Sequence, residues 1–180
     1  MKLIRFVIFL FGIFIIIFLL SLLLPSNVTI TKSVDINAPR EKIINQIIDF
    51  EQWKNWYPSF KNENFSIEKN EHPPNTISSV TLHDSIGKSL TIVLVDTSKQ
   101  TILTGRQVIN MDLQSSSPIG INYQFVLIPK LSHQTQLTWN VIIHLGWLPW
   151  KKFEGILLDK FSGSQYENAL NELKKAAESN

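Results

Sequence analysis

The chain has 180 residues, 44% of them hydrophobic, with seventeen Lys and Arg against fifteen Asp and Glu. Two of the basic residues, Lys2 and Arg5, lie in an apolar leader, so the remaining body is charge-balanced. This balance argues against a nucleic-acid-binding domain, which needs clustered basic side chains. The lack of cysteine excludes disulfides, thiol catalysis and Cys-ligated zinc.

The first 24 residues are the most apolar part of the chain. As a helix, residues 3–24 would reach about 33 Å, at 1.5 Å per residue, which is enough to cross a bilayer. A cleaved signal peptide is the alternative, but its apolar region is shorter and ends in small residues, whereas this run ends Leu22-Leu23-Leu24-Pro25. We therefore predict a retained single-pass anchor that contacts the lipid bilayer through residues 3–24.

The charges beside this anchor predict its orientation. Lys2 and Arg5 lie at its N-terminal end, so we expect a cytoplasmic N-terminus and a body on the extracytoplasmic side of the membrane. The predicted organisation is an anchor over residues 1–25 and one domain over residues 26–180.

The body begins with a strand and two short helices. Apolar and polar residues alternate over residues 28–36, as in a half-buried strand. Pro39 fits the first turn of a helix whose apolar stripe is Ile43, Ile44, Ile47 and Ile48. A second short helix places Trp53 and Trp56 on one face and ends at Pro58.

Six short runs rich in β-branched residues follow and predict an antiparallel meander. Their approximate ranges are 60–69, 77–84, 89–96, 101–110, 119–128 and 134–145. Beyond Pro149, apolar residues recur every three or four positions, which predicts a long amphipathic helix with Gly163 as a candidate site for a kink. This order of elements predicts an α+β fold in which a curved antiparallel sheet of about seven strands buries one face against the final helix.

Two stretches carry a resemblance to a known superfamily. The first is Ile36-Asn37-Ala38-Pro39, with Ile43, Ile47 and Trp53-Lys54-Asn55-Trp56-Tyr57-Pro58 after it; the second is Thr135-Gln136-Leu137-Thr138-Trp139, with the helix that contains Leu157-Leu158-Asp159-Lys160. With these stretches residues 27–178 resemble the START-like superfamily, also called SRPBCC or Bet v1-like, in particular its polyketide cyclase/dehydrase and lipid-transport branch. The resemblance implies a helix-grip fold, with a cavity for an apolar or amphipathic molecule between the sheet and the long helix.

The candidate ligand-binding residues are those that this fold would bring to the cavity or its mouth. They are Trp53, Trp56, Arg106, Tyr123, Phe125, Trp139, Phe153 and Leu157. Each aromatic or apolar candidate has plain packing as its alternative. Arg106 would meet a ligand carboxylate or phosphate if its strand face is inward, and is otherwise a solvated surface residue. Trp147 and Trp150, outside this set, either pack or enter the nearby membrane interface.

No constellation of titratable residues predicts a reaction. The four histidines, His72, His83, His133 and His144, have no carboxylate partner at a telling spacing, and no metal-hydrolase, nucleophile-elbow or phosphate-loop motif is present. We expect no metal, cofactor or catalytic residue. The preferred hypothesis is a membrane-anchored module that binds a lipid-like molecule; a cofactor-independent cyclase or dehydratase-type enzyme and an envelope protein-interaction domain with a filled pocket are the alternatives. The sequence leaves the oligomeric state open.

Overall fold

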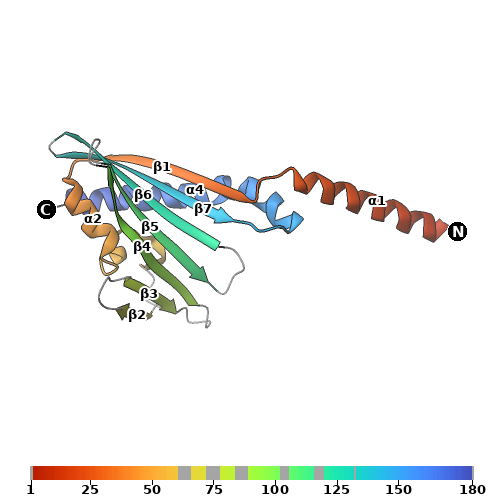
Figure 1. Ribbon diagram of the computed structural model, residues 1–180, viewed down its shortest axis with the longest axis horizontal. Coiled ribbons are helices and arrows are strands. Elements are labelled where there is room, and N and C mark those ends of the chain that lie inside the picture. The colour runs from red at the N-terminus through yellow and green to blue at the C-terminus, as the bar shows by residue number, and fades with distance from the viewer. Residues whose placement is uncertain are drawn as a thin grey trace.

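The structure is a computed structural model that describes residues 2–60, 66–71, 78–83, 89–101, 106–115, 120–131 and 133–179 (Figure 1). Within these ranges it contains helices and strands in an α+β order. In chain order they are α1 (Lys2–Leu22), β1 (Asn27–Ile36), α2 (Arg40–Ile48), α3 (Trp53–Trp56), the 3-10 helix η1 (Pro58–Phe60), β2 (Ser66–Glu71), β3 (Ser78–His83), β4 (Ser89–Thr101), β5 (Arg106–Ser115), β6 (Gly120–Leu131), β7 (Gln134–His144) and α4 (Pro149–Glu178).

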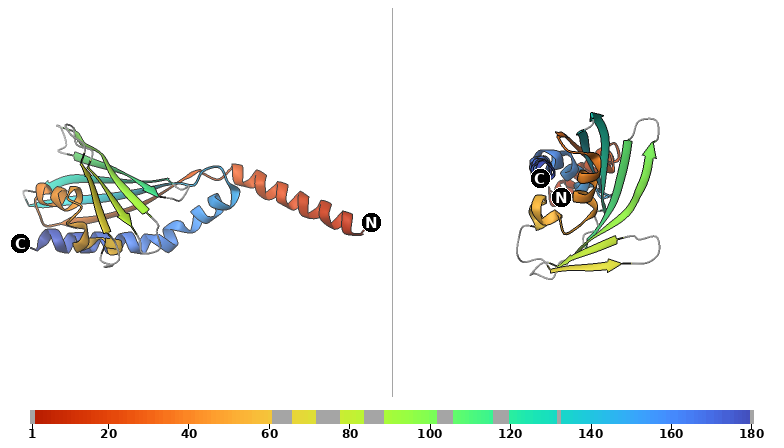
Figure 2. Two further views of the ribbon diagram at one scale, coloured as in Figure 1. Left: turned by 90° about the horizontal axis from the view of Figure 1, so that it is seen from below. Right: turned by 90° about the vertical axis from the view of Figure 1, so that its left-hand side faces the viewer.

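The strands form one antiparallel sheet in which the first and last strands are neighbours. Across the described residues its order is β1-β7-β6-β5-β4-β3-β2. β1 pairs with β7 along its whole length, from Asn27 opposite His144 to Ile36 opposite Thr135. Figure 2 shows α4 running along one face of this curved sheet, with α2 and α3 beside the second half of α4. The predicted helix-grip arrangement is confirmed.

The two faces of the sheet have opposite character. Along β7 buried and half-buried residues alternate, and the buried residues Leu137, Trp139, Val141 and Ile143 face the helices. The outer face carries amide side chains that bond across the strands: Asn140 donates to Gln124 over 3.1 Å, and Gln124 donates to Asn110 over 3.2 Å. The apolar interior therefore lies on the side of the sheet that α4 covers.

The second half of α4 supplies most of this cover. Its buried residues are Ala169, Leu170, Leu173 and Ala177. Pro149 occupies the first turn, where its missing N–H leaves no bond unmade. The helix continues without a break through Gly163, and Figure 2 shows it bent in its first half.

The predicted strand boundaries are wrong in two regions of the meander. The first expected strand of the meander began at residue 60, but Phe60 closes η1 and β2 begins at Ser66. The gap expected between the strands predicted at 89–96 and 101–110 lies inside β4, where the pairing with β5 shifts register between Leu94 and Asp96 and again between Asp96 and Lys99. Such irregular pairing lets turn-forming residues remain within a strand. β4 therefore continues to Thr101, and β5 covers residues 106–115 instead of 101–110.

The N-terminal helix α1 extends away from the body (Figure 1). It is long and apolar enough to cross a membrane, by length and composition, and its apolar side chains are almost all exposed. Its last turn meets the start of α4.

Candidate functional site

A cluster of aromatic rings lies in the described interior between the sheet and the helices. Trp139 on β7 lies at its centre: the ring centroid of Phe125 is 5.0 Å away, that of Tyr123 is 5.0 Å away and that of Tyr166 is 5.1 Å away. These spacings are those of favourable stacked and edge-to-face ring pairs. We call this set, with Trp53, Trp56, Tyr57 and Phe60 beyond it, the aromatic cluster.

Trp53 and Trp56 fasten α3 to α2. Both indole rings are fully buried, and the Nε1 atom of Trp53 donates to the backbone oxygen of Ile47 over 2.8 Å, while that of Trp56 donates to Gln46 over 3.0 Å. Ile47 and Gln46 lie in the last turn of α2, where carbonyl groups have no partner within the helix. The two tryptophans therefore cap α2, and their N–H groups are already occupied in this structure.

Three tyrosines bring hydroxyl groups into this otherwise apolar interior. The hydroxyl of Tyr57, next to α3, lies 2.8 Å from that of Tyr123 on β6, and the hydroxyl of Tyr166 on α4 interacts with Tyr123 as well. We call these three residues the tyrosine cluster; they are all the tyrosines that the chain has. Tyr123 lies on the sheet, Tyr166 on α4 and Tyr57 directly after α3. The tyrosine cluster therefore connects the sheet to α4 and to the segment that follows α3.

Burial changes the acidity of this cluster. Desolvation raises the pKa of the Tyr123 hydroxyl well above its ordinary value, and the neighbouring hydroxyls of Tyr57 and Tyr166 raise it further. Desolvation also raises the pKa of Tyr166, against the lowering effect of its hydrogen bond with Tyr123. At neutral pH the hydroxyls of Tyr123 and Tyr166 are therefore uncharged, so they can donate or accept hydrogen bonds but cannot act as phenolate bases.

The indole N–H of Trp139 is a buried donor without an acceptor. The side chain is fully buried, and its Nε1 atom has no hydrogen-bond partner among the described residues. A buried polar group left in this state costs about 1–3 kcal/mol. The centre of the aromatic cluster therefore offers an unused hydrogen-bond donor on an indole that contacts the rings of Tyr123 and Tyr166.

Phe153 and Leu157, two of the remaining predicted site residues, do not join the aromatic cluster. Phe153 and Leu157 are 39% and 48% exposed. The inward orientation expected for them is wrong, because the small residue Gly155 forms the contact between this part of α4 and the body, against Leu145 and Val28. Arg106 is the first residue of β5, and its side chain lies outside the described residues.

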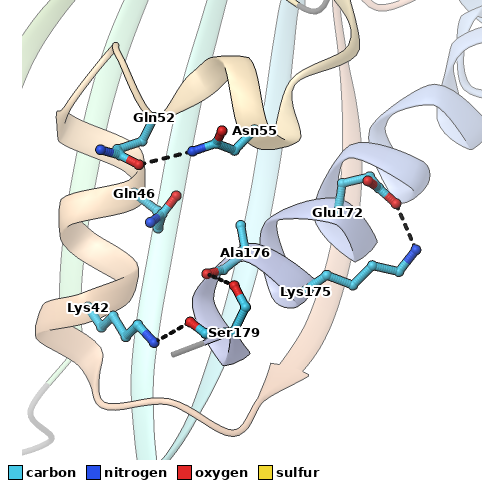
Figure 3. Close-up of a pocket in the computed structure, with 8 residues that line it drawn as sticks. All are labelled: Lys42, Gln46, Gln52, Asn55, Glu172, Lys175, Ala176 and Ser179. Carbon is cyan, nitrogen blue, oxygen red and sulfur yellow. Dashed lines mark hydrogen bonds and ion pairs between the residues drawn. The ribbon is translucent and has the colours of Figure 1, made fainter.

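A separate groove lies on the outer side of the helices (Figure 3). It has a volume of about 580 Å³ between α2, α3 and the end of α4. Its walls are polar and largely bonded to one another: Lys42 donates to the backbone oxygen of Ser179 over 2.7 Å, and Asn55 donates to Gln52 over 3.0 Å. The groove therefore lacks the apolar lining that a lipid-like molecule needs.

Sequence reasoning missed Tyr57 and Tyr166 as partners of Tyr123. Tyr57 directly follows the Trp53–Trp56 pair, but nothing in the local sequence indicates that its hydroxyl reaches β6. The two histidines with described side chains, His133 and His144, are both exposed. Among the described residues no group of three metal-ligating side chains comes together.

The arrangement of sheet, helices and buried cluster defines a START-like domain, and solved structures share this fold. The aromatase/cyclase ZhuI from Streptomyces sp. R1128 matches with a TM-score of 0.61 at 15% identity, over 84% of this chain and 94% of its own. A START superfamily protein from Mycobacterium smegmatis matches with a TM-score of 0.61 at 18% identity, over 84% and 97%. The lipid transfer and protein localization domain of human StarD13 matches with a TM-score of 0.52 at 15% identity, over 83% and 77%.

The sequence itself matches the family described as polyketide cyclase / dehydrase and lipid transport over residues 27–178. The chain belongs to this family. The match covers every described strand of the sheet and all of α4, and it begins just after α1. None of the curated proteins matches the chain.

Proposed function

We propose that the protein is a membrane-anchored module that binds a hydrophobic or amphipathic small molecule between the sheet and α4. Residues 1–25 anchor it in a bilayer, and residues 26–180 hold the ligand. The family and the fold support a ligand-binding module. The membrane anchor is inferred from the length and composition of α1.

The observation that carries the proposal is the unused N–H group of Trp139 in the aromatic cluster. Sites for small molecules are mostly apolar, with a few polar groups that fix the orientation of the ligand. An apolar body would contact the aromatic rings, and an acceptor oxygen on the ligand would accept the hydrogen bond of Trp139. We infer a lipid-like compound with at least one carbonyl, hydroxyl or carboxylate oxygen.

The tyrosine cluster favours a second function, a cofactor-independent cyclase or dehydratase-type reaction. Such a reaction needs a positioned acid or hydrogen-bond donor deep in the site. The raised pKa of Tyr123 keeps its hydroxyl protonated, as a donor to a ligand carbonyl must be. The two functions can be distinguished, because only an enzyme releases the bound compound chemically changed. If the protein is such an enzyme, Tyr123→Phe should stop the chemical change while the compound still binds.

Extraction of the bound compound tests the binding function. The buried apolar core runs from Ile30 to Ala177, so the body contains the whole core and can be produced without α1. Residues 26–180 are purified without detergent, and the compounds that remain bound are extracted and identified by mass spectrometry. We expect one class of apolar compound that carries an acceptor oxygen.

A pair of matched substitutions locates the compound. Trp139→Phe keeps a ring but removes the N–H, and it should lower the bound amount roughly three- to tenfold, because a hydrogen bond contributes about 0.5–1.5 kcal/mol. Trp147→Phe makes the same chemical change at an exposed position and should leave the amount unchanged. A folded body that is consistently empty would contradict the proposal and favour an interaction domain with a filled pocket.

A further inference from the structure

The first half of α4 has an apolar face that nothing in the described structure covers. Trp150, Phe153, Leu157 and Phe161 are exposed, with Phe161 at 74%, and Trp147 just before the helix is 73% exposed. We call these five residues the α4 stripe. Contiguous exposed apolar patches on a protein surface mark sites of contact with a membrane, a ligand or another protein.

Helical geometry places the α4 stripe on the side of α4 opposite to the sheet. Its helical members are spaced three or four positions apart, so they lie along one face. Gly155 lies on the opposite face, where an added Cβ would come within 2.2 Å of the Leu145 side chain and 3.1 Å of that of Val28. The close approach of Gly155 to the body turns the α4 stripe outward.

The start of α4 is fixed to the end of α1. Lys152 is only 7% exposed, and its Nζ atom donates to the backbone oxygen of Ser21 over 3.2 Å and to that of Leu24 over 3.3 Å. The carbonyl groups at the end of a helix lack partners within it and carry partial negative charge, so they favour a cation there. Next to this contact, the backbone N–H of Leu145 donates to the oxygen of Ser26 over 2.8 Å.

This junction sets the direction in which the α4 stripe faces. In Figure 2 (left) α1 and α4 diverge from a common point, and the sheet lies on one side of α4. The other side, which carries the stripe, faces the angle between the two helices. If α1 spans a bilayer, Trp147 and Trp150 lie at the level where α1 leaves it, and tryptophan is enriched at that depth.

We propose that the α4 stripe lies in the headgroup region of the bilayer that α1 spans, as a second membrane contact of the domain. This inference rests on the membrane anchor of the proposed function and not on its ligand. The bilayer is the occupant because the stripe begins at the junction with α1 and faces the same side as that helix. A helix with one apolar aromatic face is suited to lie in the plane of the interface.

Depth measurement with spin labels on the full chain tests the proposal. The protein has no cysteine, so single labels can be placed at will. A nitroxide is attached at Phe161→Cys, and matched labels are attached at Gly12→Cys inside α1 and at His133→Cys. His133 is exposed and lies just before β7. The opposite end of β7, at His144, pairs with Asn27 close to α1, so His133 lies at the end of the strand that is distant from α1.

The labelled chains are reconstituted in vesicles of phosphatidylcholine and phosphatidylglycerol. Collisions of each label with lipid-soluble oxygen and with a water-soluble nickel chelate are then compared. We expect the Phe161 label to favour oxygen over the chelate, between the strong preference of the Gly12 label and the reverse preference of the His133 label. This order should not change with the ratio of protein to lipid.

Each other outcome overturns the inference in a distinguishable way. A Phe161 label that behaves like the His133 label, while the Gly12 label lies in hydrocarbon, places the stripe in water and leaves the anchor intact. A Gly12 label that meets the chelate refutes the anchor, and with it both proposals for the membrane. A Phe161 label shielded from both reagents only at high protein-to-lipid ratio shows that a second copy covers the stripe.

Discussion

Lys152, near the start of α4, donates a hydrogen bond from its ammonium group to the backbone oxygen of Ser21 in the last turn of α1. The two residues are 131 positions apart in the chain, and the lysine side chain is buried. A single cation therefore links the apolar N-terminal helix to the helix that grips the sheet.

Replacing this cation should loosen the junction. Lys152→Met keeps the aliphatic stem but removes both hydrogen bonds, and bonds of this kind to a charged group contribute about 1.5–3 kcal/mol. We expect proteolysis between residues 22 and 27 of the vesicle-bound protein to accelerate roughly tenfold or more. Lys160→Met, at an exposed position of the same helix, is the control and should leave the rate unchanged. Equal rates for the two variants would show that the Lys152 contact does not hold the junction.

The tyrosine cluster should make the domain sensitive to alkali. An unfolded tyrosine loses its proton at about pH 10, whereas burial raises the pKa of Tyr123 in the folded protein. Above about pH 10 the unfolded state therefore releases a proton that the folded state retains, and the free energy of unfolding falls as the pH rises. The chain has no other tyrosines, so phenolate absorbance reports on this cluster alone.

We expect phenolate absorbance and loss of circular dichroism to appear together in one alkaline transition. In denaturant the absorbance should instead rise at the ordinary pKa. Tyrosines that titrate at about pH 10 while the fold stays intact would contradict the burial of the cluster.

Enlarging Gly155 should destabilise the body even though alanine is the better helix former. Gly155→Ala gains about 1 kcal/mol in helix propensity. The new Cβ meets the buried Leu145 side chain, and such overpacking costs about 1–3 kcal/mol. We expect a net loss of about 1 kcal/mol in the free energy of unfolding of residues 26–180, measured by denaturant titration.

A double-mutant cycle with Leu145→Ala separates the clash from other effects. The smaller side chain makes room for the new Cβ, so Gly155→Ala should become neutral or stabilising in that background. Equal effects in both backgrounds would show that this contact does not limit the approach of α4.

The basic residues in the first turn of α1 should decide the side of the membrane on which the body lies. Lys2 and Arg5 predict a cytoplasmic N-terminus. Protease that is added outside intact cells, and that can reach the outer surface of the membrane, should digest the body. The double change Lys2→Glu and Arg5→Glu should increase the fraction of the protein that is protected from digestion. Digestion of the original protein only after lysis would reverse the assigned orientation.

The interior of the fold was the part that sequence predicted best. The predicted strand over residues 134–145 and the cavity candidate Trp139 agree with β7, where successive side chains point to opposite faces and Trp139 lies on the inner one. The spacing of Ile43 and Ile47 likewise predicted the buried side of α2. Both patterns of apolar residues repeat over several positions, so a single residue that departs from the pattern does not change the prediction.

The orientation of the first half of α4 could not be predicted in the same way. Phe153, Leu157 and Phe161 have the spacing of a buried face, yet all three are exposed. Periodicity shows that apolar residues share a face, but it does not show whether protein or lipid covers that face. The deciding contact is made by Gly155, which adds nothing to a hydrophobic pattern.

The tyrosine cluster depends on contacts between distant parts of the chain. Tyr57 and Tyr123 are 66 positions apart, and no local pattern brings two hydroxyls to 2.8 Å. Only the packing of α3 against the sheet does so. The sequence therefore predicted Tyr123 and Trp139 as members of the proposed site, whereas Tyr57 and Tyr166 could be assigned to it only from the tertiary structure.

The pairing of β1 with β7 also determines when the protein can finish folding. Ile30 pairs with Val141, so the first strand gains its only sheet neighbour among the described residues after nearly all of the body has been synthesised. Pairings between such distant segments slow folding, because a long loop must close before they form. Until β7 has been synthesised, β1 therefore has no strand neighbour among the described residues, and both of its edges remain unpaired.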